Sequence, residues 1–222
     1  MANWGDLKEA PTGGGGNRDI ERLKLGETTK IRFIGPVIPR YVYWMVNNEG
    51  RRTPIECLSF NRDTQSFENT KGIDPVKEID TDLLGDQGKT SFAYITNVID
   101  RSDGKIKLCD IKSTIYKQLI DLAKDPEYGD PSDAENGYDI TIKKEKTGPQ
   151  PMNVRYSVVP GRNSTPLTSE ELDLEQYDLP AIFKRSSYDA QRTWLLENTK
   201  FFADSVPTDL QGSENEEMTD LP

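Results

Sequence analysis

Short segments of alternating apolar and polar residues, separated by turns rich in Gly, Asp and Pro, dominate the middle of this 222-residue chain. Because successive side chains of a strand point to opposite faces, such alternation is typical of half-buried β-strands. The pattern predicts seven strands, at residues 29–35, 41–46, 52–60, 91–99, 105–111, 138–144 and 153–159. Before residue 168, the spacing of apolar residues predicts one helix of several turns, at residues 113–124. One helix among many short strands argues against a parallel α/β sheet.

The order of these segments predicts the fold class. Three strands are followed by a polar insertion at residues 61–87, then by two strands, the helix and two more strands. We expect a short helix near residues 75–79 in the insertion, and Ser113 or Asp110 as the cap of the main helix. The mainly β pattern indicates an elaborated OB-fold, a small Greek-key barrel with one helix between strands.

Several local details follow from the residue types. In the first strand, Ile31 and Phe33 lie on one side, with Lys30, Arg32 and Ile34 on the other, and Gly35-Pro36 is expected to close the strand. Pro54 restricts its strand to a sheet edge or a bulge, because proline lacks a backbone donor.

Composition divides the chain into four parts. Residues 1–18 form a flexible N-terminal segment with a Gly run, and residues 19–168 form the OB-like domain. Residues 169–203 form a helical extension, with helical patterns near 169–174 and 188–202. Residues 204–222 have six acids, no base and few apolar residues, so we expect a disordered acidic tail.

The chain contains no histidine, which excludes Ser-His-Asp and Cys-His hydrolases and His-ligated zinc enzymes. Two cysteines, Cys57 and Cys109, cannot hold zinc without further ligands and are expected to be small buried groups. We therefore expect no metal, no cofactor and no enzymatic activity. The absence of a long apolar run and of a secretory signal predicts a cytoplasmic protein that does not enter a membrane.

Charge is unevenly distributed along the chain. The net charge is −10, from 28 basic and 38 acidic residues, which taken alone disfavours nucleic acid. Residues 18–60 nevertheless hold 8 bases against 5 acids, residues 91–124 hold 6 against 4, and residues 140–168 hold 5 against 1. The acids gather in residues 125–139, 169–180 and 204–222, which contain no base at all. A basic surface flanked by acidic connectors is therefore compatible with the composition.

Basic and aromatic residues interleave within the expected strands, as single-stranded nucleic acid requires. Cations neutralise phosphates, and exposed rings stack on unpaired bases. The candidates from this pattern are Lys30, Arg32, Tyr41, Tyr43, Arg51, Arg52, Phe92, Tyr94, Lys105, Lys107, Lys143 and Arg155. The alternative, that the rings are core and the cations are solvated, remains open for each residue. Both faces of residues 41–46 carry rings, including Trp44, so at least one ring should lie outside the core.

The acidic tail has two possible uses in such a protein. Its carboxylates, with Glu216, Glu217 and Asp220, can compete with nucleic acid for a basic groove, and its apolar tip, Met218 and Leu221, can bind other proteins. A purely solubilising tail is the alternative.

Three short runs are similar to a known family: Lys89-Thr-Ser-Phe92, Gly104-Lys-Ile106 and Ile115-Tyr-Lys117. With residues 23–25, 31–33, 137–141 and 153–159, they resemble bacteriophage single-stranded DNA-binding proteins of the T-even helix-destabilising type. The resemblance implies an OB-fold, binding without strong sequence preference, and roles in replication, recombination and repair of phage DNA in the host cytoplasm. It adds Lys89 and Tyr116 to the candidate DNA contacts and also supports Phe92 and Lys105.

Two departures from that family are visible. Residues 61–87 contain no Cys or His, so the zinc site of T-even members has no ligands here. Residues 1–17 hold one Lys, one Asp and one Glu, which is not a basic arm for cooperative self-association. The rivals to this interpretation are an acidic adaptor on a β-barrel without a nucleic-acid groove, and a carboxylate- or lysine-dependent enzyme.

Overall fold

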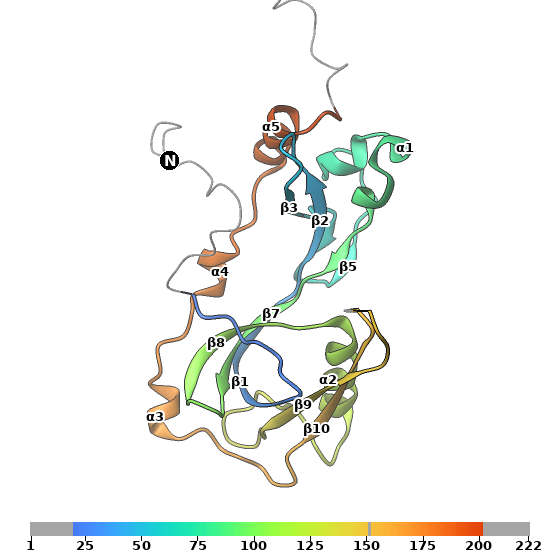
Figure 1. The fold of residues 1–222 in the computed structure, drawn as a ribbon. Helices are drawn as coiled ribbons and strands as arrows, with labels where there is room; N and C mark the ends of the chain where they lie inside the picture. The colour runs from blue at the N-terminus through green and yellow to red at the C-terminus, as the bar shows by residue number, and fades with distance from the viewer. Residues whose placement is uncertain (1–19, 151, 202–222) are drawn as a thin grey trace, which may run out of the picture.

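The computed structural model describes residues 20–150 and 152–201, and it is mainly β with antiparallel sheets and few helices (Figure 1). A five-stranded sheet has the order β10 (Val154–Pro160), β9 (Ile140–Lys146), β1 (Thr28–Ile38), β7 (Ile95–Asp100) and β8 (Lys105–Asp110). A three-stranded sheet has the order β3 (Arg52–Glu56), β2 (Tyr41–Val46) and β6 (Ser91–Phe92). The hairpin β4 (Phe60–Asn61) and β5 (Ser66–Phe67) completes the β-structure.

The helices are short except for two. They are η2 (Pro75–Glu78), α1 (Thr81–Leu84), η3 (Gly85–Gly88), α2 (Ser113–Lys124), α3 (Ser169–Leu172), α4 (Leu179–Ile182) and α5 (Tyr188–Asn198). The predicted helix at residues 113–124 is confirmed, but its N-cap is Lys112 and no side chain caps it. The short helix expected near residue 75 is confirmed as η2, whereas α4 was not expected.

Three predicted strands differ from the structure. The segment 52–60 divides into β3 and β4, which belong to different sheets. The segment 91–99 divides into β6 and β7, and the first strand does not stop at Gly35-Pro36 but continues to Ile38. The register with β7 shifts between Ile34 and Val37, so Gly35 and Pro36 form a bulge. Gly35 has φ +73°, a backbone conformation that favours glycine, and a Cβ there would lie 2.6 Å from the Gln176 amide oxygen.

One continuous antiparallel ribbon joins the two sheets. Ile38 pairs with Ile95 in the five-stranded sheet, and Tyr41 pairs with Phe92 in the three-stranded sheet. Between them the Ala93 N–H donates to the Arg40 carbonyl at 3.0 Å, so the pairing register does not change. The strand pairs β1–β2 and β6–β7 are therefore one ribbon that serves both sheets.

The main core extends from the three-stranded sheet, with Tyr43, Met45 and Ile55, to one face of the five-stranded sheet. Ile31, Phe33 and Ile140 face Ile115 and Leu119 of α2 there. Residues 21–23 pair with the edge of β8, because the Leu108 N–H donates to the Glu21 carbonyl and the Leu23 N–H donates to the Leu108 carbonyl, at 2.9 and 2.8 Å, and Leu23 packs against the main core.

The opposite face of β7 and β8 is covered by residues 165–183, which we call the strap. Leu167, Leu174 and Tyr177 of the strap pack on an apolar cluster of the sheet, which consists of Ile34, Ile99 and Ile106. Leu179 of α4 is almost completely buried against Ile95 and Leu108. Both faces of the central strands are therefore buried, although the sequence pattern predicted a half-buried first strand.

Arg32 is fully buried beneath the strap, which corrects the expectation that it contacts DNA. Its guanidinium donates to the backbone carbonyls of Thr165 (3.1 Å), Phe33 (3.3 Å), Asp133 (2.5 Å) and Pro131. Desolvation by burial lowers the pKa of Arg32. Glycine is required at Gly137, where a Cβ would lie 2.6 and 2.7 Å from two guanidinium nitrogens. Arg32 thus ties residues 125–139, which we call the acidic loop, and the strap to β1.

Lys107 is also buried, so a role in DNA contact is corrected in the same way. Its ammonium donates to Asp100 at 2.8 Å and Asp103 at 2.7 Å, and Glu21 lies 3.5 Å away. These hydrogen bonds raise the pKa of Lys107. Burial by itself would raise the pKa of Asp100, but the hydrogen bonds from Lys107 and Ser102 outweigh it, and the pKa is lowered.

Replacing Arg32 by Met should lower the free energy of unfolding by about 3 kcal/mol or more, because buried carbonyls lose their donor. The matched control is Lys30→Met on the same strand, since the Lys30 side chain is 56% exposed and pairs with Asp139 at 3.0 Å. Asp139 is buried but keeps its ion pair with Arg101 at 2.8 Å, so the loss of the exposed Lys30 ammonium should cost about 1 kcal/mol or less. Urea unfolding of both variants measures the difference, and equal losses would contradict the structural role of Arg32.

The Lys107 contacts should make stability depend on pH. A carboxyl group whose pKa is lowered by folding contributes stability above its unfolded pKa, and this contribution is lost as the pH falls through the folded pKa. The gap in unfolding free energy between wild type and Lys107→Met should therefore shrink between about pH 6 and about pH 3. Lys105→Met, on the exposed end of β8, is the control. A gap that stays constant with pH would show that Asp100 does not carry the effect.

Candidate nucleic-acid interface

Six aromatic rings meet where the ribbon passes from one sheet to the other, and we call them the ring cluster. They come from five elements and the β6–β7 connection: Tyr41, Phe60, Phe67, Phe92, Tyr94 and Tyr116. The Tyr41 ring lies in the middle, with its centroid 4.7 Å from that of Phe60, 4.9 Å from Phe67 and 5.8 Å from Phe92. The structure thus brings together four of the predicted site residues, Tyr41, Phe92, Tyr94 and Tyr116.

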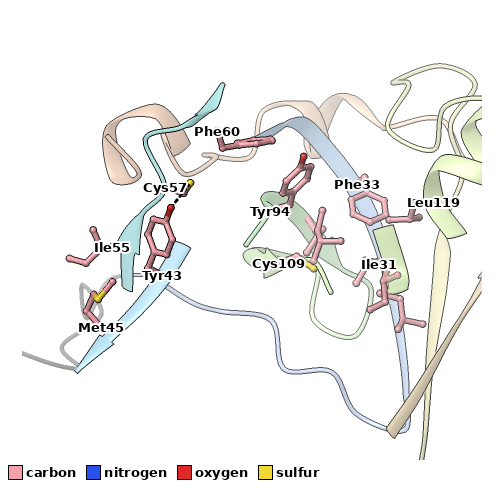
Figure 2. Close-up of a cluster of buried hydrophobic side chains, with 14 of the residues drawn as sticks. Ile31, Phe33, Tyr43, Met45, Ile55, Cys57, Phe60, Tyr94, Cys109 and Leu119 are labelled. Carbon is pink, nitrogen blue, oxygen red and sulfur yellow. Dashed lines mark hydrogen bonds between the residues drawn. The ribbon is translucent and has the colours of Figure 1, made fainter. Parts of the chain in front are cut away.

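The ring cluster has a buried floor and an exposed rim. Phe60 and Tyr94 are buried, and they lie between the core side chains of the two sheets (Figure 2). Phe67 is 45% exposed, and Tyr41, Phe92 and Tyr116 are half-buried. An exposed ring held by other rings keeps its orientation, which prepares it for stacking on a flat ligand.

Strand pairing and one helix position these rings. Tyr41 stands opposite Phe92 in the ribbon, and Phe60 stands opposite Phe67 in the β4–β5 hairpin. The Phe92 and Tyr94 rings stack at 4.0 Å with an interplanar angle of 18°. Tyr116 reaches the cluster from α2, with its centroid 4.8 Å from Tyr94, and its hydroxyl donates to Gln65 at 3.4 Å.

A groove of about 310 Å³ begins beside Tyr116. Its lining is largely apolar, with Phe33, Val37 and Leu119, and its polar groups include Asp130 and Ser132. Apolar volumes of this size with a few polar groups accommodate small planar ligands. The groove extends the surface of the ring cluster along α2.

The cations nearest the ring cluster in the chain lie on its flanks. Lys112 is exposed, and its carbonyl accepts the Tyr116 N–H at 2.9 Å, one helical turn away. Lys117 follows Tyr116 and is also exposed. Lys112 and Lys117 are therefore the cations that α2 places beside the ring cluster. Lys89 precedes β6, is exposed, and forms an ion pair with Asp86 at 2.7 Å, and the β2–β6 register continued to this residue brings it level with Trp44, on the other face of β2.

The other predicted cations lie elsewhere. Lys30, Lys143 and Arg155 share the outer face of β1, β9 and β10, since Lys30 stands opposite Thr141 and Lys143 opposite Thr28. Lys105 stands opposite Asp100, at the end of β7 remote from Phe92. Arg51 and Arg52 are exposed at the β2–β3 turn. The three net-positive segments do supply adjacent strands, but they do not place their cations on a single face.

Tyr43 is buried in the three-stranded sheet, which corrects its prediction as a DNA contact. Its hydroxyl donates to the Asp74 carboxylate at 3.0 Å and accepts from the Cys57 thiol at 3.3 Å. Burial raises the pKa of Tyr43 and the pKa of Cys57. Cys57 and Cys109 are both free and buried, as predicted. Among the rings of β2, Trp44 is the exposed one.

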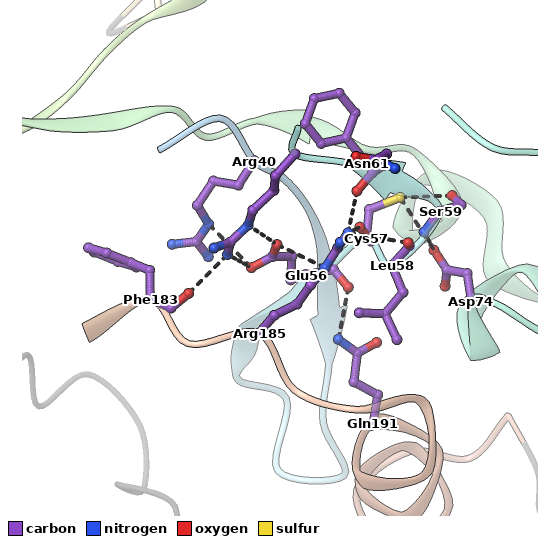
Figure 3. A network of polar contacts seen from close by, with 12 residues as sticks. Arg40, Glu56, Cys57, Leu58, Ser59, Asn61, Asp74, Phe183, Arg185 and Gln191 are labelled. Carbon is purple, nitrogen blue, oxygen red and sulfur yellow. Dashed lines mark hydrogen bonds and ion pairs between the residues drawn. The ribbon is translucent and has the colours of Figure 1, made fainter. Parts of the chain in front are cut away.

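Three arginines converge on Glu56 behind the ring cluster (Figure 3). Arg62 makes two hydrogen bonds to the carboxylate at 2.8 and 2.5 Å, while Arg185 and Arg40 lie 3.3 and 3.8 Å from it. Arg185 also donates to the carbonyls of Cys57 (2.8 Å), Leu58 (3.2 Å) and Phe60. This network attaches the segment after the strap to the strand and hairpin that carry Phe60 and Phe67.

Sequence reasoning missed four contributors to the site. Phe67 lies in the segment interpreted as a polar insertion, Phe60 is expected only as part of a strand, and neither Lys112 nor Lys117 is among the expected DNA contacts. An aromatic residue isolated in a polar segment is the one signal that pointed to Phe67.

Two further classes of feature complete the description. The tail residues Glu216, Glu217, Met218, Asp220 and Leu221 lie outside the described residues, as do residues 1–19. Within residues 20–150 and 152–201, no group of three or more Cys, Asp or Glu side chains is arranged to hold a metal ion. None of the described helices is long and apolar enough to cross a membrane.

Comparison with known proteins gives one informative match. No family model matches the chain. It is 41% identical, over 154 residues, to a probable ssDNA-binding protein of Escherichia phage T5. The match covers 66% of this chain and 56% of the T5 protein, so the chain spans little more than half the length of that relative. Identity at this level over such a length indicates common ancestry. The match does not test the narrower resemblance to the T-even type. The chain is thus related to a bacteriophage protein named as a probable single-stranded DNA-binding protein, which confirms its resemblance to bacteriophage single-stranded DNA-binding proteins.

Proposed function

We propose that this chain is a non-enzymatic single-stranded DNA-binding protein whose ligand stacks on the rim of the ring cluster. The observation that carries the proposal is a set of rings at the surface, exposed Phe67 and half-buried Tyr41, Phe92 and Tyr116, held over buried Phe60 and Tyr94. Such rings bind unpaired bases, whereas the bases of a duplex are already stacked on each other. The name of the phage T5 relative supports the same ligand.

The strand order supports an OB-fold for the residue 19–168 domain. Strand β1 pairs with both β7 and β9, hairpins add β8 and β10 at the two sides, and α2 connects β8 to β9. OB-folds bind oligonucleotides at the face of their second and third strands and at the loops that follow the first and fourth strands. Here the strap covers the outer face of β7 and β8, so we assign binding to the long excursion between β1 and β7, which carries most of the ring cluster.

The wider biological role rests on the resemblance to phage proteins. We place the chain in replication, recombination and repair of phage DNA in the cytoplasm of the infected bacterium, without a metal or other cofactor. Residues 169–203 act as the extension that covers the domain. Residues 204–222 recruit protein partners through Met218 and Leu221 and compete with DNA through their carboxylates.

A labelled oligo-dT should bind the full-length protein far more tightly than a duplex of the same length, with affinity falling steeply as salt rises. Neutralised phosphates release counterions, so the logarithm of the affinity should fall linearly with the logarithm of the salt concentration. Fluorescence anisotropy at two or more salt concentrations measures both effects. A preference for duplex, or no binding at low salt, would favour the adaptor without a nucleic-acid groove.

Replacing Phe67 or Phe92 by Ala should weaken oligo-dT binding about 5- to 100-fold, since each stacked base contributes about 1–3 kcal/mol. Phe67 is exposed, so its loss should leave the melting temperature nearly unchanged. The matched control is Tyr128→Ala, an exposed ring in the acidic loop that contacts Tyr138 at 5.9 Å rather than the ring cluster. If Phe67→Ala and Phe92→Ala bind oligo-dT as tightly as wild type and Tyr128→Ala do, the ring cluster is not the DNA interface.

A further inference from the structure

Trp44 is an exposed ring on the face of β2 opposite to the ring cluster. Side chains alternate along a strand, so Tyr41 and Tyr43 share one face and Trp44 lies on the other. Trp44 is 43% exposed, and the residue that pairs with it in the neighbouring strand β3 is Pro54. Trp44 therefore belongs neither to the core nor to the ring cluster.

Cations lie on both sides of Trp44. The β2–β6 register pairs Tyr41 with Phe92 and Val42 with Ser91, and its continuation brings Lys89 level with Trp44. The Val46 N–H donates to the Gln87 side chain at 2.6 Å, which agrees with that continuation. On the other side, Arg52 pairs with Val46, two residues from Trp44 and on the same face.

These cations are accessible to a ligand. The Lys89 side chain is 78% exposed, and its partner Asp86 is more exposed still, so their ion pair costs little to open. Arg52 is exposed, and no ion pair is found for it among the described side chains. A large ring between two accessible cations matches a base with its neighbouring phosphates.

We propose that Trp44, Lys89 and Arg52 form a second stacking site for single-stranded DNA, occupied by the same strand after it leaves the ring cluster. The inference rests on the proposed function and extends its path. Trp44 is three residues from Tyr41, about 10 Å along β2. In the described structure β6 pairs only with β2 and is therefore an edge strand. The DNA strand can pass over this edge of the sheet between Phe92 and Lys89.

Charge complementarity favours DNA over a protein partner at this face. The chain as a whole carries a net charge of −10, yet Trp44 is flanked by Lys89 and Arg52 rather than by carboxylates alone. A polyanion is attracted to such a local reversal of charge. Bound DNA would also continue directly from the ring cluster, because only the short strand β6 lies between the two sites. A separate protein partner would not extend the ring-cluster interface in this way.

The test compares two oligo-dT lengths on the full-length protein, about 3 and about 20 nucleotides, because the few bases of the short strand are taken up by the ring cluster and only the longer strand has further bases for Trp44. Trp44→Ala should leave the affinity for the short strand unchanged and weaken the long strand about 5- to 20-fold. Tyr128→Ala is the matched control and should change neither affinity. In a Trp4→Phe, Trp194→Phe background, the remaining Trp44 fluorescence should be quenched by the long strand and not by the short one.

The outcomes separate the two proposals. If wild type binds neither strand, the proposed function fails. If wild type binds both strands and Trp44→Ala leaves the long-strand affinity unchanged, or weakens both equally, the second site is wrong while the ring cluster stands. A Lys89→Ala variant that reproduces the length-dependent loss supports the crossing at the β6 edge, and one that binds the long strand normally overturns that path.

Discussion

The pairing of β1–β2 with β6–β7, whose register is constant from Val37 to Val42, is the constraint on which the rest of the structure depends. A two-stranded ribbon that belongs to two sheets must bend between them, and the bulge at Gly35-Pro36 lies just before that bend. The Ala93–Arg40 hydrogen bond keeps the register across it. Side chains on the bent side, such as Tyr41 and Phe92, are thereby brought next to rings from the β4–β5 hairpin and from α2.

The two faces of the five-stranded sheet serve different purposes. One face, with α2, Leu23 and Leu25, contributes to the core against which Tyr94 and Phe60 pack. The other face is covered by the strap and holds Arg32 in a shell of backbone carbonyls. Because the strap takes the sheet surface itself, exposed aromatic area is concentrated in the excursion between β1 and β7. The burial of Arg32 and the exposure of the rim of the ring cluster therefore both follow from the position of the strap.

Local patterns predicted most strands and the main helix, because alternation and helical spacing are read within ten residues or so. They also predicted that the rings of residues 41–46 and 91–99 would matter, and Tyr41, Phe92 and Tyr94 do meet. What the sequence could not show is which cation is paired across distance. Arg32 and Lys107 look like strand cations, but their partners are the strap, the acidic loop and the β7–β8 turn. Likewise Tyr43 and Trp44 are adjacent and equivalent in pattern, and only the packing of η2 and Asp74 buries the former.

The strap also affects how the chain is made. Arg32 and its acceptor Thr165 are 133 residues apart, and Leu179 packs on strands that emerge from the ribosome long before it. Until residues 165–183 are synthesised, the apolar face of Ile34, Ile99 and Ile106 has no cover and the Arg32 guanidinium lacks some of its acceptors. Contacts of such sequence separation slow folding and leave a nascent chain open to aggregation. The domain therefore completes its folding only after the strap has been synthesised. A chain released earlier exposes an apolar sheet face that is prone to aggregation.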